Sequence, residues 1–244
     1  MTFLLVREDR EHLLGPGDRL ESDLGILEVP EDVQPGDVVE THIGEEFVVR
    51  KPRGPDLFDH LDRTGAPMLP RDIGLVIGQL GLAAGDCVLD AGTGTGILAV
   101  YLGRLGIQVT TYEQDAEFAE VARENVATAG VGDRVEVRTG DVTGALDELV
   151  GRDFDGLTLD TADAPAVLEQ APELLAAGAP AAVYSPFVEA ARDCVETARA
   201  AGLVEVECVE TIQREMEFDE RGSRPSTRGV GHTGYLTFAR APLR

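Results

Sequence analysis

The spacing of apolar residues changes near residue 70 and divides the chain into two parts. Up to residue 55, short apolar runs alternate with polar residues and are separated by turns such as Gly15-Pro16-Gly17-Asp18. A period of two predicts strands with one buried face, and clusters of glycine, proline and aspartate predict turns. We therefore predict a small N-terminal β-domain over residues 1–55, with strands at Phe3–Val6, Gly25–Val29, Val38–Glu40 and Glu46–Arg50.

The stretch Lys51–Pro70 is rich in proline, glycine and charge, and we place a linker at residues 56–70 within it. In residues 71–244, apolar runs alternate with segments of helical period. This alternation predicts an α/β domain with a Rossmann-like, mostly parallel sheet covered by helices on both faces. The predicted strands are Cys87–Leu89, Gln108–Tyr112, Arg134–Arg138, Gly156–Leu159, Ala181–Tyr184, Leu203–Thr211 and Tyr235–Ala239.

Side chains on one face of two predicted helices indicate core packing. The stripes are Phe118, Val121, Ala122 and Asn125 in the first helix and Leu168, Ala171, Leu174 and Leu175 in the second. Cys87 lies in an apolar run and is predicted to be a small buried hydrophobic residue rather than a nucleophile. The cysteines and histidines are widely separated, so neither a zinc site nor a disulfide framework is indicated.

The formal net charge of −24 is the most unusual property of the composition. Acidic residues are spread through the chain and arginine replaces lysine everywhere except at Lys51, which indicates adaptation to molar salt, as in a halophilic archaeon. At molar salt the Debye length is about 3 Å, so local arginines can still bind phosphate and the net charge does not exclude a nucleic-acid partner. No run approaches the roughly 18 to 20 apolar residues of a membrane helix, and we expect a cytoplasmic protein without a membrane partner.

The segment Asp90-Ala91-Gly92-Thr93-Gly94-Thr95-Gly96 joins a predicted strand to a predicted helix. Glycines allow a backbone to approach a ligand closely and to adopt positive φ without steric cost. The spacing G-x-G-x-G after an acidic residue differs from the G-x-G-x-x-G of dinucleotide enzymes. Glycine turns of this kind can also be purely structural.

Two further acidic residues follow the next two strands. Glu113 comes about 20 residues after the glycine turn, where a carboxylate can accept both ribose hydroxyls of an adenosyl group. Asp141 follows the third strand, where it can bind the adenine amino group. Ligands of such sheets bind outside the carboxyl ends of the strands, so the three positions together predict an adenosyl site.

Asp90–Gly96, Glu113 and Asp141 resemble the cofactor motifs of class I methyltransferases. The wider pattern resembles the tRNA adenine-N1 methyltransferase family, which modifies the T-loop of tRNA. That narrower resemblance rests on three further segments, Gly65–Asp72, Phe154–Asp160 and Arg224–Leu236, of which the last is the most specific.

The resemblance spans nearly the whole chain and implies S-adenosylmethionine as cofactor, tRNA as substrate and a homotetramer. Asp160 matches the catalytic aspartate of the family, and the alternative for this residue is a strand-end cap facing solvent. The predicted cofactor-binding residues are Gly92, Gly94, Thr95, Gly96, Ile97, Leu98, Glu113, Phe118, Asp141 and Asp160. The chain departs from the family at Leu69, where an aromatic residue is common, and in the run Tyr184–Ala190, where a glutamine is common.

Arginines before the last predicted strand are the candidates for RNA contact, because a planar guanidinium can bond two phosphate oxygens. They are Arg214, Arg221, Arg224 and Arg228, with Arg50, Lys51 and Arg53 as additional candidates. His232 is expected to be structural, a backbone-anchoring group rather than a general base. Two alternative functions are a small-molecule methyltransferase, such as the corrin-pathway enzymes, and a non-catalytic RNA-binding subunit of the same fold.

Overall fold

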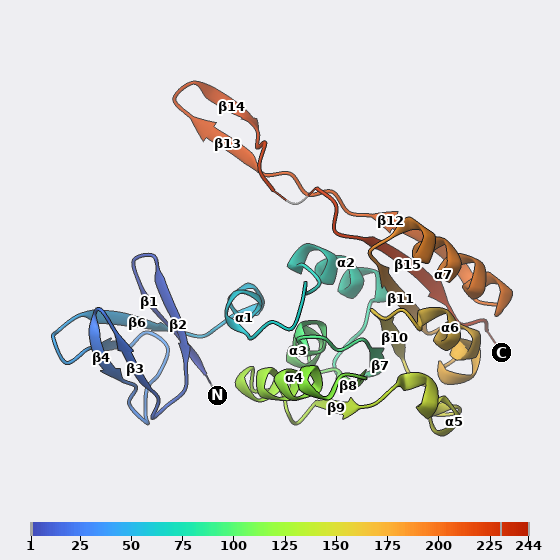
Figure 1. The fold of residues 1–244 in the computed structure, drawn as a ribbon, viewed down its shortest axis with the longest axis horizontal. Helices are drawn as coiled ribbons and strands as arrows, with labels where there is room; N and C mark the ends of the chain where they lie inside the picture. The colour runs from blue at the N-terminus through green and yellow to red at the C-terminus, as the bar shows by residue number, and fades with distance from the viewer. Residues whose placement is uncertain (1, 230, 244) are drawn as a thin grey trace.

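Two sheets dominate the computed structural model, which describes residues 2–229 and 231–243 (Figure 1). The first belongs to the N-terminal domain and is antiparallel, with strand order β2-β1-β6-β5. Its strands are β1 (Phe3–Arg7), β2 (Arg10–Leu14), β5 (Val38–Glu40) and β6 (Glu46–Arg50), and a separate hairpin pairs β3 (Arg19–Ser22) with β4 (Gly25–Glu28).

The N-terminal domain has a hydrophobic core of its own, as the alternating pattern predicted. In β6 the side chains of Phe47 and Val49 are buried while their neighbours face solvent. Phe3, Leu5 and Leu27 complete the centre of this core. Four of the six strands were predicted; β2 and β3 were missed because charged residues occupy much of both strands.

The second sheet has seven strands in the order β12-β15-β11-β10-β7-β8-β9. The strands β10, β7, β8 and β9 run parallel, as does β11 beside β10, and β15 is antiparallel to both β11 and β12. This confirms the Rossmann-like α/β prediction. The bounds are β7 Cys87–Ala91, β8 Gln108–Glu113, β9 Val135–Thr139, β10 Gly156–Leu159, β11 Pro180–Ser185, β12 Val204–Glu210 and β15 Tyr235–Arg240.

Helices cover both faces of this sheet, so successive residues of the central strand enter different cores. Val88 packs in the core that includes α2 (Pro70–Leu80), α3 (Ile97–Arg104) and α4 (Ala116–Thr128). Leu89 packs in the opposite core, with α6 (Ala164–Leu174) and α7 (Val188–Ala200). Short helical turns η1 (Val142–Ala145) and α5 (Leu146–Leu149) border that second core. In the described part of the chain, no helix has the length and apolarity needed to cross a membrane.

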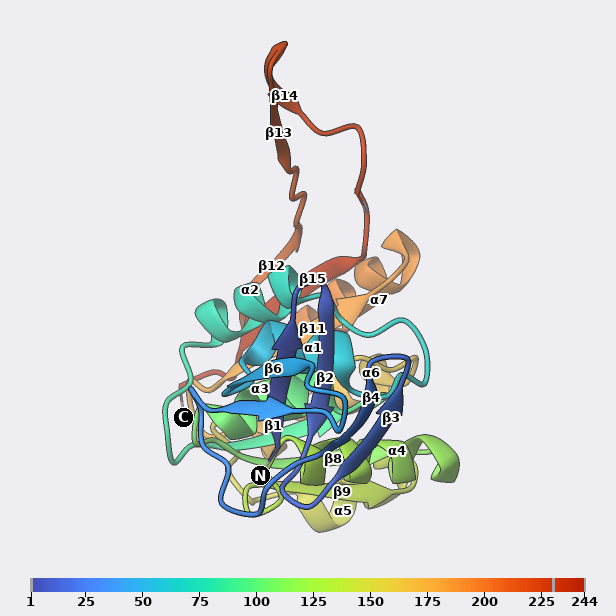
Figure 2. The same ribbon diagram turned by 90° about the vertical axis from the view of Figure 1, so that its left-hand side faces the viewer.

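A hairpin projects from the α/β domain, and Figure 2 shows it extending well beyond the rest of the molecule. It pairs β13 (Met216–Asp219) with β14 (Gly222–Pro225). Three large apolar side chains on and near it are exposed to solvent, namely Ile212, Met216 and Phe218. The sequence pattern did not predict this hairpin, because its strands bury nothing within one chain.

Three other predictions need correction. The linker is not irregular throughout, because α1 (Gly54–His60) lies in it and buries Leu57 completely. Cys87 is exposed rather than buried, since it is the first residue of β7, at the amino end of this central strand. In α4 the predicted stripe is only partly right: Ala122 and Asn125 are buried, but Phe118 is 38% exposed and Val121 half-buried, and Ala119 and Val126 are buried instead. The stripe of α6 is confirmed, with all four side chains buried.

Candidate functional site

The glycine turn follows β7 at the centre of the large sheet. Gly92, Gly94 and Gly96 all have positive φ, at 86°, 52° and 76°. A Cβ on Gly92 would collide with the carbonyl oxygen of Asp160, so only glycine allows the ends of β7 and β10 to lie this close. Gly96 caps α3 and packs against Ala122, so this glycine has a structural role in the turn.

A pocket opens above this turn and contains most of the predicted cofactor residues. One wall is the glycine turn with the start of α3, and the facing wall is an irregular segment of the predicted linker, Thr64–Met68. The lining also includes Asp90, Asp160 and Phe118. Of the predicted cofactor-binding residues, those that line the pocket are Gly92, Gly94, Thr95, Ile97, Leu98, Phe118 and Asp160.

Glu113 and Asp141 lie at the neighbouring strand ends but do not line the pocket. The Glu113 carboxylate accepts hydrogen bonds from the backbone N–H of Gly94 at 2.9 Å and of Asp115 at 3.1 Å. These bonds orient it beside the glycine turn, as an acceptor for ribose hydroxyls should be. Asp141 is exposed and accepts a bond from Thr143 N–H at 2.8 Å, so it caps its own helical turn. Hydrogen bonding to the Thr143 side chain, and secondly to its N–H, lowers the pKa of the Asp141 carboxyl.

Asp90 is buried below the turn and bound by hydroxyls from both neighbouring strands. The strand registers place Thr111 of β8 and Thr158 of β10 directly opposite it. Both hydroxyls donate to the Asp90 carboxylate, and Thr93 of the glycine turn bonds to Thr111 in turn. Burial nevertheless raises the pKa of Asp90.

Asp160 is the acidic residue that faces the pocket interior. Burial, and secondly the nearby carboxyl of Asp90, raise its pKa to about 7. A carboxyl poised near neutral pH in a pocket is typical of a functional group. Asp160 is half-buried and lines the pocket, which favours a functional carboxyl over a strand-end cap that faces solvent.

Next to Asp160 lies a second set of polar residues that the sequence did not reveal as a unit. Tyr184, near the carboxyl end of β11, donates its hydroxyl to the carbonyl of Thr233, and its ring packs on Gly234, where a Cβ would come within 2.7 Å. The Thr233 hydroxyl donates to buried Asp72 at 2.8 Å and accepts from Arg71 at 3.1 Å. Burial, and then the charge of Asp160, raise the pKa of Tyr184. The start of α2 and the chain returning from the hairpin therefore meet at the mouth of the site.

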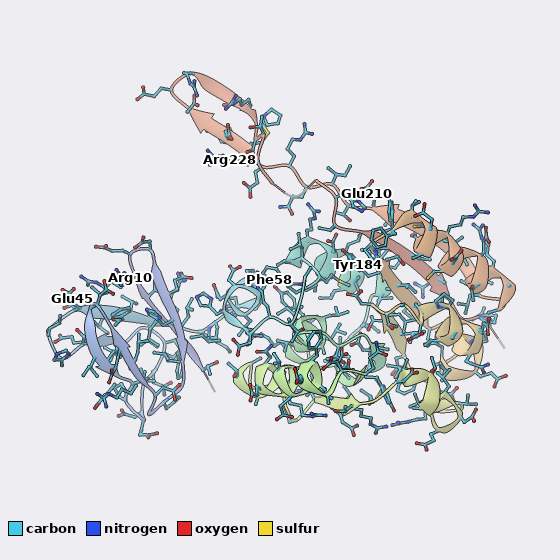
Figure 3. All side chains as sticks on the ribbon, in the orientation of Figure 1. Arg10, Glu45, Phe58, Tyr184, Glu210 and Arg228 are labelled. Atoms are coloured by element: carbon cyan, nitrogen blue, oxygen red, sulfur yellow. The ribbon has the colours of Figure 1, made fainter. Side chains whose placement is uncertain are left out.

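The predicted RNA-binding arginines are all on or beside the projecting hairpin. Arg221 pairs with Asp219 at 3.1 Å and Arg224 with Glu217 at 2.9 Å. Arg228 lines a second cavity together with Leu69 and Arg71, at the junction of hairpin and α2. Figure 3 shows Arg228 beside the hairpin and Tyr184 on the sheet below it. Arg50, Lys51 and Arg53 line a different hollow, beside α1 and the N-terminal domain.

His232 connects the hairpin segment to the sheet. Its Nδ1 lies 2.7 Å from a Glu210 carboxylate oxygen and its Nε2 lies 3.2 Å from the carbonyl of Pro186. The bond to Glu210, and then that to Pro186, raise the pKa of the imidazole. These contacts agree with the expected anchoring role. Val230, which belongs to the signature segment Arg224–Leu236, lies outside the described residues.

Among the described residues, no group of three or more His, Cys, Asp or Glu side chains could hold a metal ion. The cofactor that the motifs suggest needs none: the lining offers the apolar side chains of Met68, Ile97 and Leu98 with the Glu113 carboxylate at the rim. This donor set fits an adenosyl group, whose base is apolar on its faces and whose ribose donates hydroxyls.

Comparisons with known proteins agree with this geometry. Residues 55–222 match the family model of the tRNA methyltransferase complex GCD14 subunit. A curated relative from Methanocaldococcus jannaschii, tRNA (adenine(57)-N(1)/adenine(58)-N(1))-methyltransferase TrmI, is 34% identical, with 92% of this chain and 89% of the relative covered.

Two solved structures match along the full chain. The S-adenosylmethionine-dependent O-methyltransferase of Thermotoga maritima has a TM-score of 0.82 and 26% identity, with 100% of this chain and 93% of the other covered. The tRNA (m1A58) methyltransferase TrmI of Aquifex aeolicus has a TM-score of 0.76 and 24% identity, with 100% and 98% covered. Both likenesses include the N-terminal β-domain, because they extend over the entire chain.

Proposed function

The chain belongs to the tRNA methyltransferase family of the GCD14 subunit, and from this membership we propose that it methylates N1 of an adenine in the T-loop of tRNA. It is an enzyme that uses S-adenosylmethionine and acts on tRNA adenine. The observation that carries the proposal is the match to the M. jannaschii relative over 92% of the chain. That relative is named for two adjacent adenines, 57 and 58, and we propose the same region of tRNA as the target here.

The residues in and beside the pocket have distinct proposed roles in binding the cofactor. S-Adenosylmethionine supplies, when bound, a methyl group on a positively charged sulfur. The glycine turn with Ile97 and Leu98 holds the adenosyl group, and the Glu113 carboxylate accepts its ribose hydroxyls. Phe118 is exposed on α4 at the pocket wall, where it can pack on an adenine face.

Asp160 is the proposed catalytic residue. Methylation of adenine N1 brings positive charge onto the base, and a carboxylate that accepts a hydrogen bond from the exocyclic amine stabilises that charge. Asp160 lines the pocket beside the glycine turn, and its charge acts on Tyr184, so the target adenine would bind with its exocyclic amine at this carboxylate. The carboxylate form is needed, and a pKa of about 7 makes it predominant only above neutral pH.

The hairpin is the proposed tRNA-binding element. Residues 211–234 contain four arginines and four acidic residues, whereas the whole chain has a net charge of −24. Phosphate is therefore repelled less by this segment than by the chain as a whole. Arg228 and Arg71 line the cavity next to the site and would guide the target nucleotide toward Asp160.

Neither alternative function accounts for the whole chain. A small-molecule acceptor is disfavoured because the relative that matches 92% of the chain is a tRNA methyltransferase. A non-catalytic RNA-binding subunit needs neither an intact glycine turn nor a carboxyl of raised pKa in the pocket, and this chain has both.

Transfer of a labelled methyl group to an unmodified tRNA transcript tests the proposal. We expect incorporation into tRNA, and none into a transcript whose T-loop adenines are replaced by guanines. Equal labelling of both transcripts would contradict the proposed target.

Two properties of the protein in solution belong to the same proposal. We propose a homotetramer in which the exposed side chains of Ile212, Met216 and Phe218 are buried between copies, so light scattering should give four times the chain mass of 26.0 kDa.

We also propose a cytoplasmic enzyme of a high-salt organism. Its melting temperature should then rise steeply between dilute buffer and molar KCl, because salt screens the repulsion among acidic side chains.

A further inference from the structure

Asn125 is a buried polar residue that has no role in the proposed methyl transfer itself. It lies on α4 and is only 3% exposed, although its amide carries two donors and an acceptor. The amide group does not line the cofactor pocket. A buried amide must find partners, since leaving it unbonded costs stability. The identity of these partners suggests what the residue does.

All bonds of the Asn125 amide go to backbone atoms of two segments. Its Nδ2 donates to the carbonyl of Asp62 at 2.9 Å, and its Oδ1 accepts from the N–H of Asp62 at 3.1 Å. The same Nδ2 also donates to the carbonyl of Thr95 at 2.9 Å. One side chain therefore connects the backbone of the linker region to the backbone of the glycine turn.

These two segments continue into opposite walls of the cofactor pocket. We call residues 62–69, between α1 and α2, the strap; it has no helix or strand, and its residues Thr64–Met68 form one wall. Thr95 belongs to the facing wall. The distance between the walls at this end is thus set by Asn125.

The other end of the strap is fixed independently. Met68 is 6% exposed, and Asp72, just beyond the strap, is 2% exposed and bonded to Thr233. Gly65 and Ala66, in the middle of the strap, are exposed. A segment held at both ends loses little conformational freedom when a ligand binds beneath it, and this favours affinity.

We propose that Asn125 is a positioning residue of the cofactor site, which holds the strap over the glycine turn so that S-adenosylmethionine meets a preformed pocket. This inference rests on the proposed function. It assigns Asn125 an effect on cofactor affinity and none on the transfer step, because the amide contacts neither the pocket interior nor Asp160.

Two isosteric variants test the proposal. Asn125→Leu removes all three bonds, and Asn125→Asp keeps an acceptor but removes both donors. We expect each to raise the Kd for S-adenosylmethionine by about tenfold, with the single-turnover rate at saturating cofactor within about twofold of wild type. Peptides that span residues 61–69 should exchange amide hydrogens faster in both variants.

The matched control is Thr237→Val, another isosteric change at a buried polar residue. Thr237 is 2% exposed on β15, and its hydroxyl has no hydrogen-bond partner among the described residues. The control should keep the wild-type Kd and the wild-type exchange of residues 61–69. A matching rise in Kd for Thr237→Val would show a general effect of core damage and would overturn the proposal.

The remaining outcomes separate this inference from the proposed function. A wild-type protein that does not bind S-adenosylmethionine in calorimetry would refute the function itself. Wild-type binding with an unchanged Kd in the Asn125 variants, or a lower rate with an unchanged Kd, would overturn the positioning role alone. Should neither variant fold, exchange in the ligand-free wild type decides: the Asp62 amide must be protected, and exchange as fast as that of an unbonded amide would overturn the proposal.

Discussion

The two sides of the site are built in different ways. On the cofactor side, the wall formed by the glycine turn is continuous in sequence: Asp90–Leu98 forms one strand end, one turn and the start of one helix, with Glu113 at the next strand end, and the strap lies opposite. The target side combines Arg71, Tyr184, Thr233 and Arg228, which come from one helix, one strand and the base of the hairpin. A local motif fixes the first, whereas tertiary structure alone brings the second together. Variants on the two sides should accordingly change different kinetic constants.

The largest effect is expected for Asp160, where the two sides meet. Asp160→Asn keeps the shape of the side chain but removes the charge that stabilises the methylated base. We expect the single-turnover rate at saturating S-adenosylmethionine and tRNA to fall by about 10² or more, the scale for losing one preorganised electrostatic group. Rapid-quench measurement of methyl transfer checks this. A variant with the wild-type rate would leave Asp160 as a structural residue.

A smaller effect, confined to the cofactor side, is expected for Glu113. Glu113→Gln replaces a charged acceptor that is oriented by the Gly94 and Asp115 amides. The Kd for S-adenosylmethionine should rise by about tenfold, because bonds to charged groups contribute more than neutral ones. The KM for tRNA should not change. Isothermal titration calorimetry measures the Kd and steady-state kinetics the KM. A change in the KM for tRNA alone would contradict the assignment of Glu113 to the cofactor side.

Variants of the hairpin arginines should weaken tRNA binding and leave cofactor binding unchanged. Arg224→Ala and Arg228→Ala each remove one phosphate-binding group, so the KM for tRNA should rise several-fold while the Kd for S-adenosylmethionine is unchanged. Arg192→Ala is a matched control, because Arg192 is exposed on α7 and bonded to Glu196. A control that weakens tRNA binding as much as the hairpin variants would refute a specific role for the hairpin.

The smallest effect concerns thermal stability and again involves Asp160, where the cofactor side and the target side meet. The folded pKa of Asp160 is about 7, above the roughly 3.9 of an unfolded aspartate, so ionisation opposes folding as the pH rises between these values. Asp160→Asn should therefore melt several degrees higher than wild type at pH 8, and at nearly the same temperature at pH 4. Thermal melts in constant molar KCl test this. Equal melting temperatures at pH 8 would mean that Asp160 is not held in a desolvated position.

The difference between the two sides also explains what the sequence could and could not predict. Asp90–Gly96 and Glu113 were recognisable because strand, turn and helix follow each other within few residues. Asp160 was found only through resemblance, since a single acidic residue after a strand is common. Tyr184 and Thr233 could not be paired from the sequence, because 49 residues separate them and their bond depends on the antiparallel register of β11 and β15.

The same reasoning applies to the fold. Strands such as β5 and β6 were predicted with their observed bounds, because alternation of buried and exposed residues identifies them. The helix α1 was missed because Gly54-Pro55 resembles a linker, although a proline in the first turn and Asp56, which bonds the Arg53 N–H at 2.6 Å, stabilise a helix start. The hairpin was missed because its apolar side chains have no partner within one chain.

The most direct measurement of the central claim is the identity of the methylated nucleoside. Unmodified tRNA transcript is incubated with S-adenosylmethionine and either the wild type or Asp160→Asn at pH 8 in molar KCl, then digested and analysed by chromatography and mass spectrometry. The account predicts 1-methyladenosine with the wild-type enzyme and strongly reduced 1-methyladenosine with the variant. A methyl group at another position of adenine, on another nucleoside, or equally abundant with both proteins would contradict it.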